Sequence, residues 1–287
     1  MSSSSLRPAA FALAALLACV PESAAVELHL QVSGGLLRSR FADIDQALKD
    51  WSASWETFCA KTPNWGFEQT GNLRQSGSTS FGAELSAKFG GRWAVGLGLG
   101  LYYSNFVDLD APLYLENPVA KFEYTSPTKV AAYPVYLFGE YAFPFGKAWE
   151  AYLRGGMGFV PVRYVHREKF RDIQAANPGV SLSELASASG AFLLAGTGVR
   201  FPVDTALSLF VEAGYIMAKV SPFEGDLGDE TTGVLYYYQE YDSTLEFWQT
   251  KLRLQAEEPA GFDFRAVRKA SIDLSGLSLR AGLRMKF

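Results

Sequence analysis

The stretch LSLRAGLRMKF, residues 277–287, decides the fold. Its apolar residues alternate one by one with small or cationic residues, as in a β-strand whose two faces differ. Three cations, Arg280, Arg284 and Lys286, share the second face. Burying such a face in the core of a soluble protein costs free energy, whereas a membrane barrel turns apolar side chains toward lipid and polar ones toward its lumen. The stretch therefore predicts a strand of a membrane barrel.

Seven earlier segments show the same alternation: 26–34, 78–89, 93–104, 129–143, 148–160, 190–201 and 206–217. Short and long connections alternate strictly between them, which is typical of bacterial outer-membrane proteins with short periplasmic turns and long external loops. The sequence therefore predicts an all-β fold. The predicted fold is a transmembrane antiparallel up-and-down β-barrel of eight strands, with short helices in the extracellular loops.

Aromatic residues give an independent check on this assignment. On the outward face of three predicted strands they recur ten residues apart, as the pairs Trp93 and Tyr103, Tyr133 and Phe143, and Trp149 and Phe159. At about 3.3 Å per residue and about 40° of tilt, this spacing spans roughly 25 Å, the height of the apolar band between two aromatic girdles. We expect these six residues to belong to the girdles.

At its C-terminal end the chain resembles the bacterial outer-membrane β-barrels, and over nearly all of residues 26–287 it is similar to the small OmpA-like eight-stranded barrels. Those proteins carry a C-terminal assembly signal, which corresponds here to Gly282, Met285 and Phe287. The resemblance implies recognition by the barrel-assembly machinery, location in the outer membrane of a Gram-negative bacterium, and contact with outer-membrane lipid and lipopolysaccharide. A monomer is expected.

Residues 1–25 are expected to be a secretory signal peptide, followed by an outer-membrane barrel domain at 26–287. Arg7 precedes a short apolar core at 10–20, and 23–25 supply the small residues of a cleavage site. One alternative stays open, because the residues before Cys19 resemble a lipoprotein signal. If cleavage follows Ala25, only Cys59 remains, and no disulfide within the chain is possible.

The composition excludes several classes of function. The 287 residues carry a net charge of −4 with a mean hydropathy of +0.03. A helical membrane bundle would be far more apolar, and a nucleic-acid-binding protein would carry a basic excess. There are only two histidines and no cluster of cysteine and histidine, so neither a transition-metal site nor a cofactor is predicted.

Charges of both signs lie on the inward face of the predicted strands, namely Glu84, Glu140, Arg154, Glu212, Arg280 and Arg284. An eight-stranded barrel is just wide enough for side chains to fill it. We therefore interpret these residues as a plug of ion pairs, of the kind known in small OmpA-like barrels. A narrow path for ions is the alternative.

The long connections carry predicted structure of their own. An apolar spacing of three and four residues predicts an amphipathic helix that packs on the barrel mouth or its outer rim. Its apolar face consists of Phe41, Ile44, Leu48, Trp51 and Trp55. Ser181 and Glu184 form a capping box, which predicts a short helix within 161–189. Segments 234–241 and 245–254 predict a hairpin outside the membrane. Pro134 predicts a bulge in its strand, because it lacks a backbone donor.

We interpret the chain as a non-enzymatic outer-membrane barrel that displays large surface loops for adhesion, recognition or envelope integrity, with a surface ligand held by the loops. A narrow pore for small solutes is the alternative. A lipid-modifying enzyme is less favoured, because His166 is expected in a loop without a nucleophile beside it.

Overall fold

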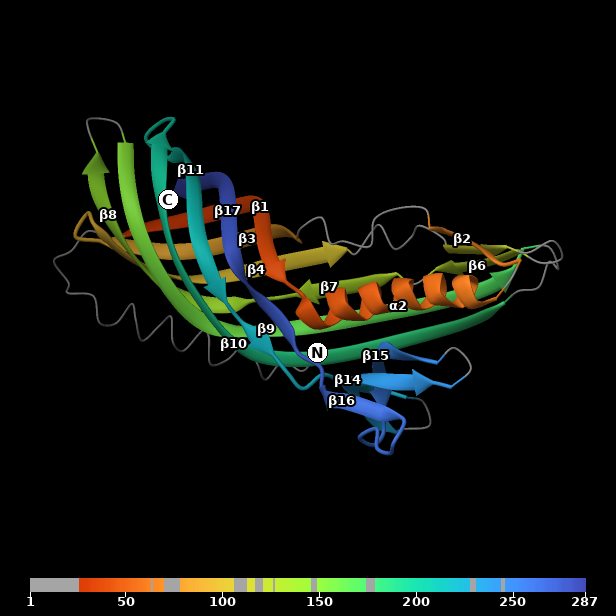
Figure 1. The fold of residues 1–287 in the computed structure, drawn as a ribbon. Helices are drawn as coiled ribbons and strands as arrows, with labels where there is room; N and C mark the ends of the chain where they lie inside the picture. The colour runs from red at the N-terminus through yellow and green to blue at the C-terminus, as the bar shows by residue number, and fades with distance from the viewer. Residues whose placement is uncertain are drawn as a thin grey trace.

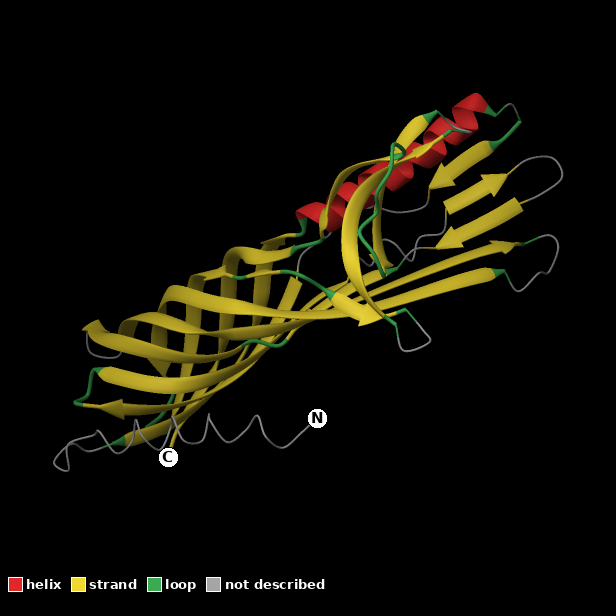
Figure 2. Ribbon diagram, turned by 90° about the horizontal axis from the view of Figure 1, so that it is seen from below, coloured by secondary structure: helices red, strands yellow, loops and turns green. Residues whose placement is uncertain are grey.

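The computed structural model describes residues 26–62, 64–69, 78–105, 113–116, 121–125, 127–145, 149–173, 179–227, 231–243 and 246–287. The predicted signal peptide and Cys19 therefore lie outside the described residues. Within them the fold is a single antiparallel sheet with one long helix, arranged as a ring of strands that continues at one end into a smaller head (Figures 1 and 2).

Eight strand segments close the ring. In spatial order they are β1 (Glu27–Arg40), β3 (Ser78–Phe89), β4 (Trp93–Asn105), β7 with β8 (Thr128–Ala132 and Val135–Phe145), β9 (Trp149–Asp172), β10 (Val180–Pro202), β11 (Leu207–Met217) and β17 (Ile272–Lys286). The last strand pairs back on the first, from His29 against Lys286 onward. The sequence prediction of eight antiparallel segments is thus confirmed at the level of strand pairing.

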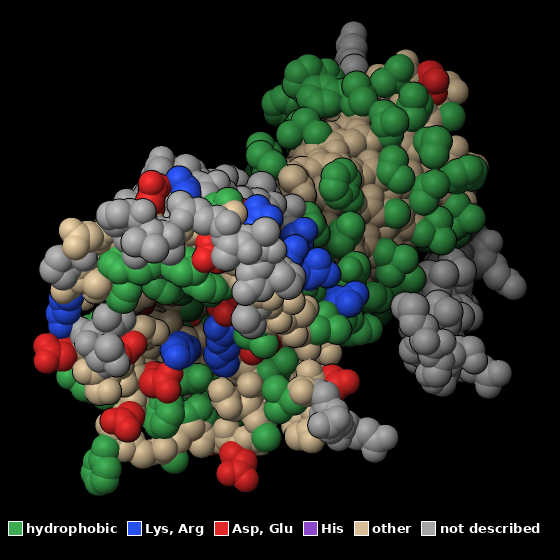
Figure 3. Space-filling view, turned by 90° about the vertical axis from the view of Figure 1, so that its right-hand side faces the viewer, with side chains coloured by type: hydrophobic (Ala, Val, Ile, Leu, Met, Phe, Trp, Pro, Cys, Tyr) green, Lys and Arg blue, Asp and Glu red, His purple; other side chains and the backbone are tan. Residues whose placement is uncertain are grey.

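The two faces of the ring differ in the sense that the sequence predicts. Leu153, Met157 and Leu279 point outward and expose more than half of their surface, at 53%, 66% and 55%. Arg154 and Glu84 point inward and are buried. Figure 3 shows apolar side chains spread over the outer wall of the ring, whereas charged side chains gather on the head. No helix among the described residues has the length and apolarity needed to cross a membrane.

Strands β9 and β10 continue well past the ring and form the base of the head. They pair from Arg200 against Glu150 to Val180 against Phe170. The prediction of a long connection with a capped helix at 161–189 is therefore wrong. Ser181 and Glu184 lie in β10. The alternation continues beyond Val160, but with cations on its outward face. Charged residues on an outward face are stable in water, and we infer that the head lies outside the apolar belt.

The remaining head elements pack against this base (Figure 1). They are helix α2 (Ala42–Lys61), the hairpin β14 (Thr232–Asp242) and β15 (Phe247–Gln255), and the strands β2 (Gly66–Gln69), β5 (Leu113–Glu116), β6 (Lys121–Thr125), β12 (Lys219–Val220), β13 (Glu224–Asp226) and β16 (Phe264–Lys269). The structure confirms the predicted hairpin and helix. Ile44 and Leu48 of the helix are buried in the apolar core that joins ring and head.

Pro134 does not cause the predicted bulge. Tyr102 pairs with Ala132 and Leu99 pairs with Val135, so the register runs through the proline unchanged. The carbonyl of Pro134 still accepts the amide of Gly100 at 2.9 Å. The proline ring occupies the space above Gly100, where a Cβ would come within 2.8 Å of it. A glycine opposite the proline therefore replaces the expected bulge.

Candidate functional site

Four charged side chains from four strands meet in the middle of the bore. We call this group, Glu84, Arg154, Glu212 and Arg280, the ion cluster. Arg154 donates to Glu84 Oε2 at 2.9 Å and to Glu212 Oε2 at 3.0 Å. Arg280 pairs with Glu84 Oε1 at 2.6 Å and with Glu212 Oε1 at 2.7 Å. Each cation thus bridges both carboxylates, and the cluster ties β3, β9, β11 and β17 together.

Neutral donors complete the hydrogen bonding of the two carboxylates. Tyr136 donates to Glu84 at 2.6 Å, Gln31 donates to Glu84 at 3.0 Å, and Tyr152 donates to Glu212 at 3.0 Å. The ring of Tyr136 lies directly over Gly98, where a Cβ would come within 2.3 Å of it. Buried charges are tolerated when every lone pair is satisfied, and such a network holds its members in one arrangement.

A second group of ion pairs lies closer to the short turns. Glu140 accepts from Arg284 at 3.2 Å and also from Arg200. Arg200 in turn donates to Glu150 at 3.2 Å, and Glu150 pairs with Lys88 at 2.7 Å. The structure thus places all six charged residues singled out from the sequence in two layers of ion pairs inside the ring. Arg200, Glu150 and Lys88 were missed, although each lies at an inward position of its strand.

On the head side of the ion cluster the bore is filled by apolar side chains. This apolar group extends from the ring strands to helix α2. Its members include Leu37, Phe41, Ile44, Val160, Val162, Phe192, Ile216 and Ile272. The cavity that borders Arg280 and Glu212 measures about 30 Å³, room for little more than one water molecule. Within the described part of the chain the bore is therefore filled rather than open.

The aromatic residues expected in the girdles face outward at the two levels predicted. Trp93, Phe143 and Trp149 lie at the end of the short turns, and all are more than 40% exposed. Tyr133 and Phe159 are exposed in the same way at the other end, with Tyr103 partly exposed beside them.

The residues of the expected assembly signal lie at the closing edge of the ring. Gly282 leaves space for the ring of Phe210, which a Cβ would meet at 2.8 Å. Met285 is 37% exposed and Phe287 74% exposed. The amide of Phe287 donates to Leu28 at 2.9 Å, so the last residue still follows β1.

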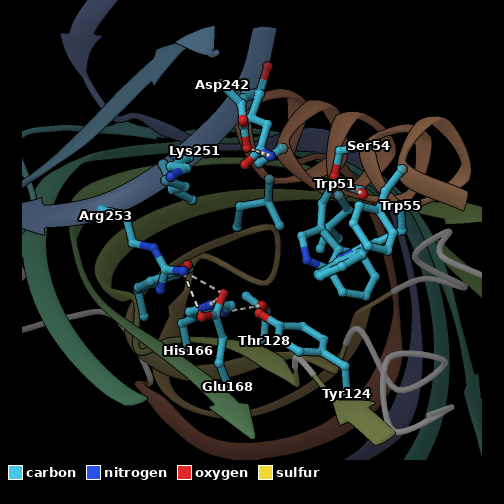
Figure 4. A pocket seen from close by; sticks show the side chains of 18 residues that line it. Trp51, Ser54, Trp55, Tyr124, Thr128, His166, Glu168, Asp242, Lys251 and Arg253 are labelled. Carbon is cyan, nitrogen blue, oxygen red and sulfur yellow. Dashed lines mark hydrogen bonds and ion pairs between the residues drawn. The ribbon is translucent and has the colours of Figure 1, made fainter. Parts of the chain in front are cut away.

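A cavity of about 490 Å³ opens in the head, and we call it the head cavity. Helix α2 forms one wall, the extensions of β7 and β9 with β6 form the floor, and the hairpin β14–β15 forms the opposite wall (Figure 4). The volume lies within the range of about 300–1,000 Å³ that is typical of pockets for small ligands. Nine of its eighteen lining residues are polar.

The floor carries a row of connected polar groups. Thr128 Oγ1 and His166 Nδ1 are 2.9 Å apart, and His166 Nε2 lies 3.1 Å from Glu168 Oε1. Arg253 Nη2, from the hairpin, donates to Oε1 and Oε2 of the same carboxylate at 2.7 and 2.6 Å (Figure 4). Burial raises the pKa of the Glu168 carboxyl, but the His166 hydrogen bond and the Arg253 charge outweigh it and lower the pKa to about 2.

Aromatic rings form the wall beside this floor. Trp51 and Tyr124 approach to 5.0 Å between ring centroids, and Trp55 and Tyr124 to 6.0 Å. Burial, together with the nearby Glu168 carboxylate, raises the pKa of Tyr124, so its hydroxyl stays neutral. The indole nitrogen of Trp55 is buried and donates no hydrogen bond to any described residue. A buried donor without an acceptor is costly, and this one belongs to a residue that lines the cavity.

The prediction that His166 lies in a loop without a nucleophile nearby is wrong. His166 points inward from β9, and the Thr128 hydroxyl lies beside it. A hydroxyl, an imidazole and a carboxylate within hydrogen-bond distance of one another, in this order, is the arrangement of a catalytic triad. However, Thr128 is 2% exposed, and Arg253 holds Glu168. We therefore interpret the row as a fixed polar floor that can orient a bound molecule.

Sequence reasoning missed this cavity because its members come from five separate segments. A usable signal was present in β9, where Tyr164, His166 and Glu168 continue the inward alternation beyond Val160. No group of three or more metal-ligating side chains occurs among the described residues. The acidic side chains Glu224 and Asp226 lie in β13, and residues 228–230 lie outside the described part of the chain.

Comparison with known proteins leaves the family open. No family model and no curated protein matches the sequence. Among solved structures, Neisserial surface protein A (NspA) matches with a TM-score of 0.37 and 11% identity over 93% of this chain and 100% of that one. The outer membrane protein OprG from Pseudomonas aeruginosa gives 0.38 and 11% over 91% and 95%. The outer membrane protease OmpT from Escherichia coli gives 0.24 and 9% over 93% and 98%. At these values, function has to be argued from the chain's own residues.

Proposed function

We propose that this chain is a non-enzymatic outer-membrane protein of a Gram-negative bacterium, with a closed bore, that recognises a ligand at the cell surface through its head. The observation that carries the proposal is the contrast between the bore and the head cavity. The bore is filled with ion pairs and apolar side chains, whereas the head cavity of about 490 Å³ has room for a small molecule.

The outer wall of the ring supports a position in lipid. Large apolar side chains on all the ring strands are exposed, including Leu36, Phe81, Leu99, Leu137, Leu153, Leu193, Leu209 and Leu283. An exposed apolar surface that encircles a protein is unfavourable in water and is expected against hydrocarbon. The internal ion cluster has the complementary position, shielded from lipid by the strands.

A change of residue type on the outward face marks one edge of this apolar belt. On β1, Leu36 is followed two residues later by Arg38, and from β11 to β12 Met217 is followed by Lys219. On β9 the cation Arg163 lies two outward positions beyond Phe159. In the same way, Lys129 of β7 lies two outward positions before Tyr133, which follows that strand. None of these four cations forms an ion pair with a described residue. Such a row suits the phosphates of lipopolysaccharide, which we propose as its partner.

The floor of the head cavity argues against passage of solutes. Tyr164 and Leu48 line the cavity and also belong to the apolar core beneath it. A molecule that enters the cavity from outside would therefore meet packed side chains and not a channel. Binding accounts for such a hollow better than transport, and we propose recognition over the alternative of a narrow pore.

Two measurements test the proposal. The refolded full-length protein should require detergent or lipid to stay in solution, and in planar bilayers it should give no regular conductance steps. Recovery from the aqueous fraction without detergent would overturn the membrane assignment. Regular steps that change in size in Arg154→Ala or Glu84→Ala would overturn the closed bore and favour a pore.

A further inference from the structure

We propose that the head cavity binds a neutral saccharide of one or two rings, stacked on the aromatic wall and held at its edges by the polar floor and the hairpin. The inference deepens the proposed function and rests on its assumption that the head faces outward. It follows from three properties of the cavity: the balance of its charges, its division into an aromatic and a polar side, and its unused donor.

Glu168, Arg253 and Lys251, three of the charged side chains that line the cavity, already have partners of opposite sign. Glu168 is paired with Arg253 and hydrogen-bonded to His166. Lys251 is paired with Glu240, and Asp242 accepts a hydrogen bond from Gln249 at 3.3 Å. A charged ligand would have to displace one of these partners, since an ion enters a partly buried site only with a counter-charge. The cavity therefore suits an uncharged molecule.

The two sides of the cavity differ in kind. Trp51, Trp55, Phe58 and Tyr124 give one side flat aromatic surfaces, and the facing hairpin presents Gln249, Thr250 and Lys251. A sugar ring has the matching asymmetry, because its C–H groups form an apolar face and its hydroxyls project around the edge. A purely apolar ligand would bury the polar residues without giving them partners, which costs free energy.

Trp55 supplies a specific point of recognition. Its indole N–H is buried, finds no acceptor among the residues that the structure describes, and belongs to the cavity wall. A hydroxyl or ring oxygen of a bound sugar would provide the acceptor. The aromatic wall and the polar floor are each held by contacts within the protein. The ring centroids of Trp51 and Tyr124 are 5.0 Å apart, and His166 Nε2 lies 3.1 Å from Glu168 Oε1. The site is therefore organised before a ligand binds.

The experiment uses the full-length protein in detergent, with cellobiose, lactose, maltose and chitobiose as neutral probes. Tryptophan fluorescence and titration calorimetry should detect saturable binding of at least one probe. Glucose 6-phosphate, acetylcholine and 1-naphthol serve as anionic, cationic and apolar comparisons and should bind more weakly. Trp51→Ala should weaken binding by at least about tenfold, and Trp55→Phe, which keeps a ring but removes the N–H, by about fivefold.

Trp248→Phe is the matched control. Trp248 lies on the same hairpin but outside the cavity, against Arg265 and Tyr241, so its substitution should leave binding unchanged. Folding of each variant is checked by gel electrophoresis, in which a folded barrel migrates differently before and after heating. The inference is overturned if the folded protein binds none of the neutral probes, if a comparison compound binds more tightly, or if Trp51→Ala binds as well as the wild type. None of these outcomes alters the conductance and solubility results, so the proposed function can stand or fail separately.

Discussion

Arg154 is the residue on which the ion cluster depends most, because it bridges two buried carboxylates and its side chain is fully buried. In Arg154→Met the two carboxylates would keep only Arg280 as a cation. Removing one member of a buried ion pair costs about 3–5 kcal/mol of unfolding free energy. Urea titration of the refolded protein in lipid vesicles should show a loss of that size. Arg163→Met, at an exposed outward position, should change stability by less than about 0.5 kcal/mol. Equal effects of both substitutions would contradict the assignment.

Glu168 makes the stability of the head depend on pH. Its folded pKa of about 2 lies below the ordinary 4.5. A carboxyl with a lowered pKa stabilises the fold above the unfolded value, and this contribution is lost as the pH falls from about 4.5 toward 2. The loss is on the order of 3 kcal/mol at most. Glu168→Gln cannot titrate, so the difference in unfolding free energy between wild type and variant should shrink across this range. Parallel pH profiles would show that the carboxylate has no such role.

At the scale of the strand, β4 is built to accept the side chains of its neighbour. Gly96 and Gly98 lie beneath Phe138 and Tyr136, and each would place a Cβ within 2.5 Å of a ring. Gly98→Ala should displace Tyr136 from Glu84 and lower stability by about 1–3 kcal/mol, the usual cost of overpacking. Gly139→Ala is the control, because its Cβ would meet nothing within 4 Å. Unfolding in vesicles measures both, and an unaffected Gly98→Ala would contradict this account.

The sequence predicts these strands well because the outward and inward positions of the ring carry opposite types of residue, apolar outside and polar inside. Where that contrast ends, the prediction fails. Beyond Val160 the outward positions of β9 include the cations Arg163, Arg167 and Lys169. This pattern resembles that of a solvated loop, although the pairing with β10 continues. The Ser181 and Glu184 spacing matches a helix cap, but backbone pairing with β9 outweighs that local preference.

The candidate site shows the same limit. Inward charges such as Glu84 and Arg280 are recognisable from the alternation alone, since a narrow bore leaves them nowhere else to pair. The contact of Thr128 with His166 depends on how β7 is placed beside β9, and the grip of Arg253 on Glu168 joins residues 85 positions apart. No local pattern encodes those contacts, which arise only when the head is assembled.

At the scale of the molecule, the apolar belt should tolerate charge according to depth. Leu153→Arg introduces a cation in the middle of the outward face, where the cost in a bilayer is about 2–4 kcal/mol. Ser187→Arg lies opposite Arg163 on the outward face of β10, beyond the belt, and should cost less than about 0.5 kcal/mol. Unfolding in lipid vesicles separates the two. If Leu153→Arg were neutral there, the belt would not face hydrocarbon.

The pairing of β17 with β1 has a consequence for biosynthesis. One edge of β1 has no strand to pair with until β17 has formed beside it. A bare strand edge of this kind is a template for association with other chains. An unclosed ring is therefore exposed to association with other copies of the chain, and crowding or slow pairing of β17 with β1 should favour aggregates over closed rings.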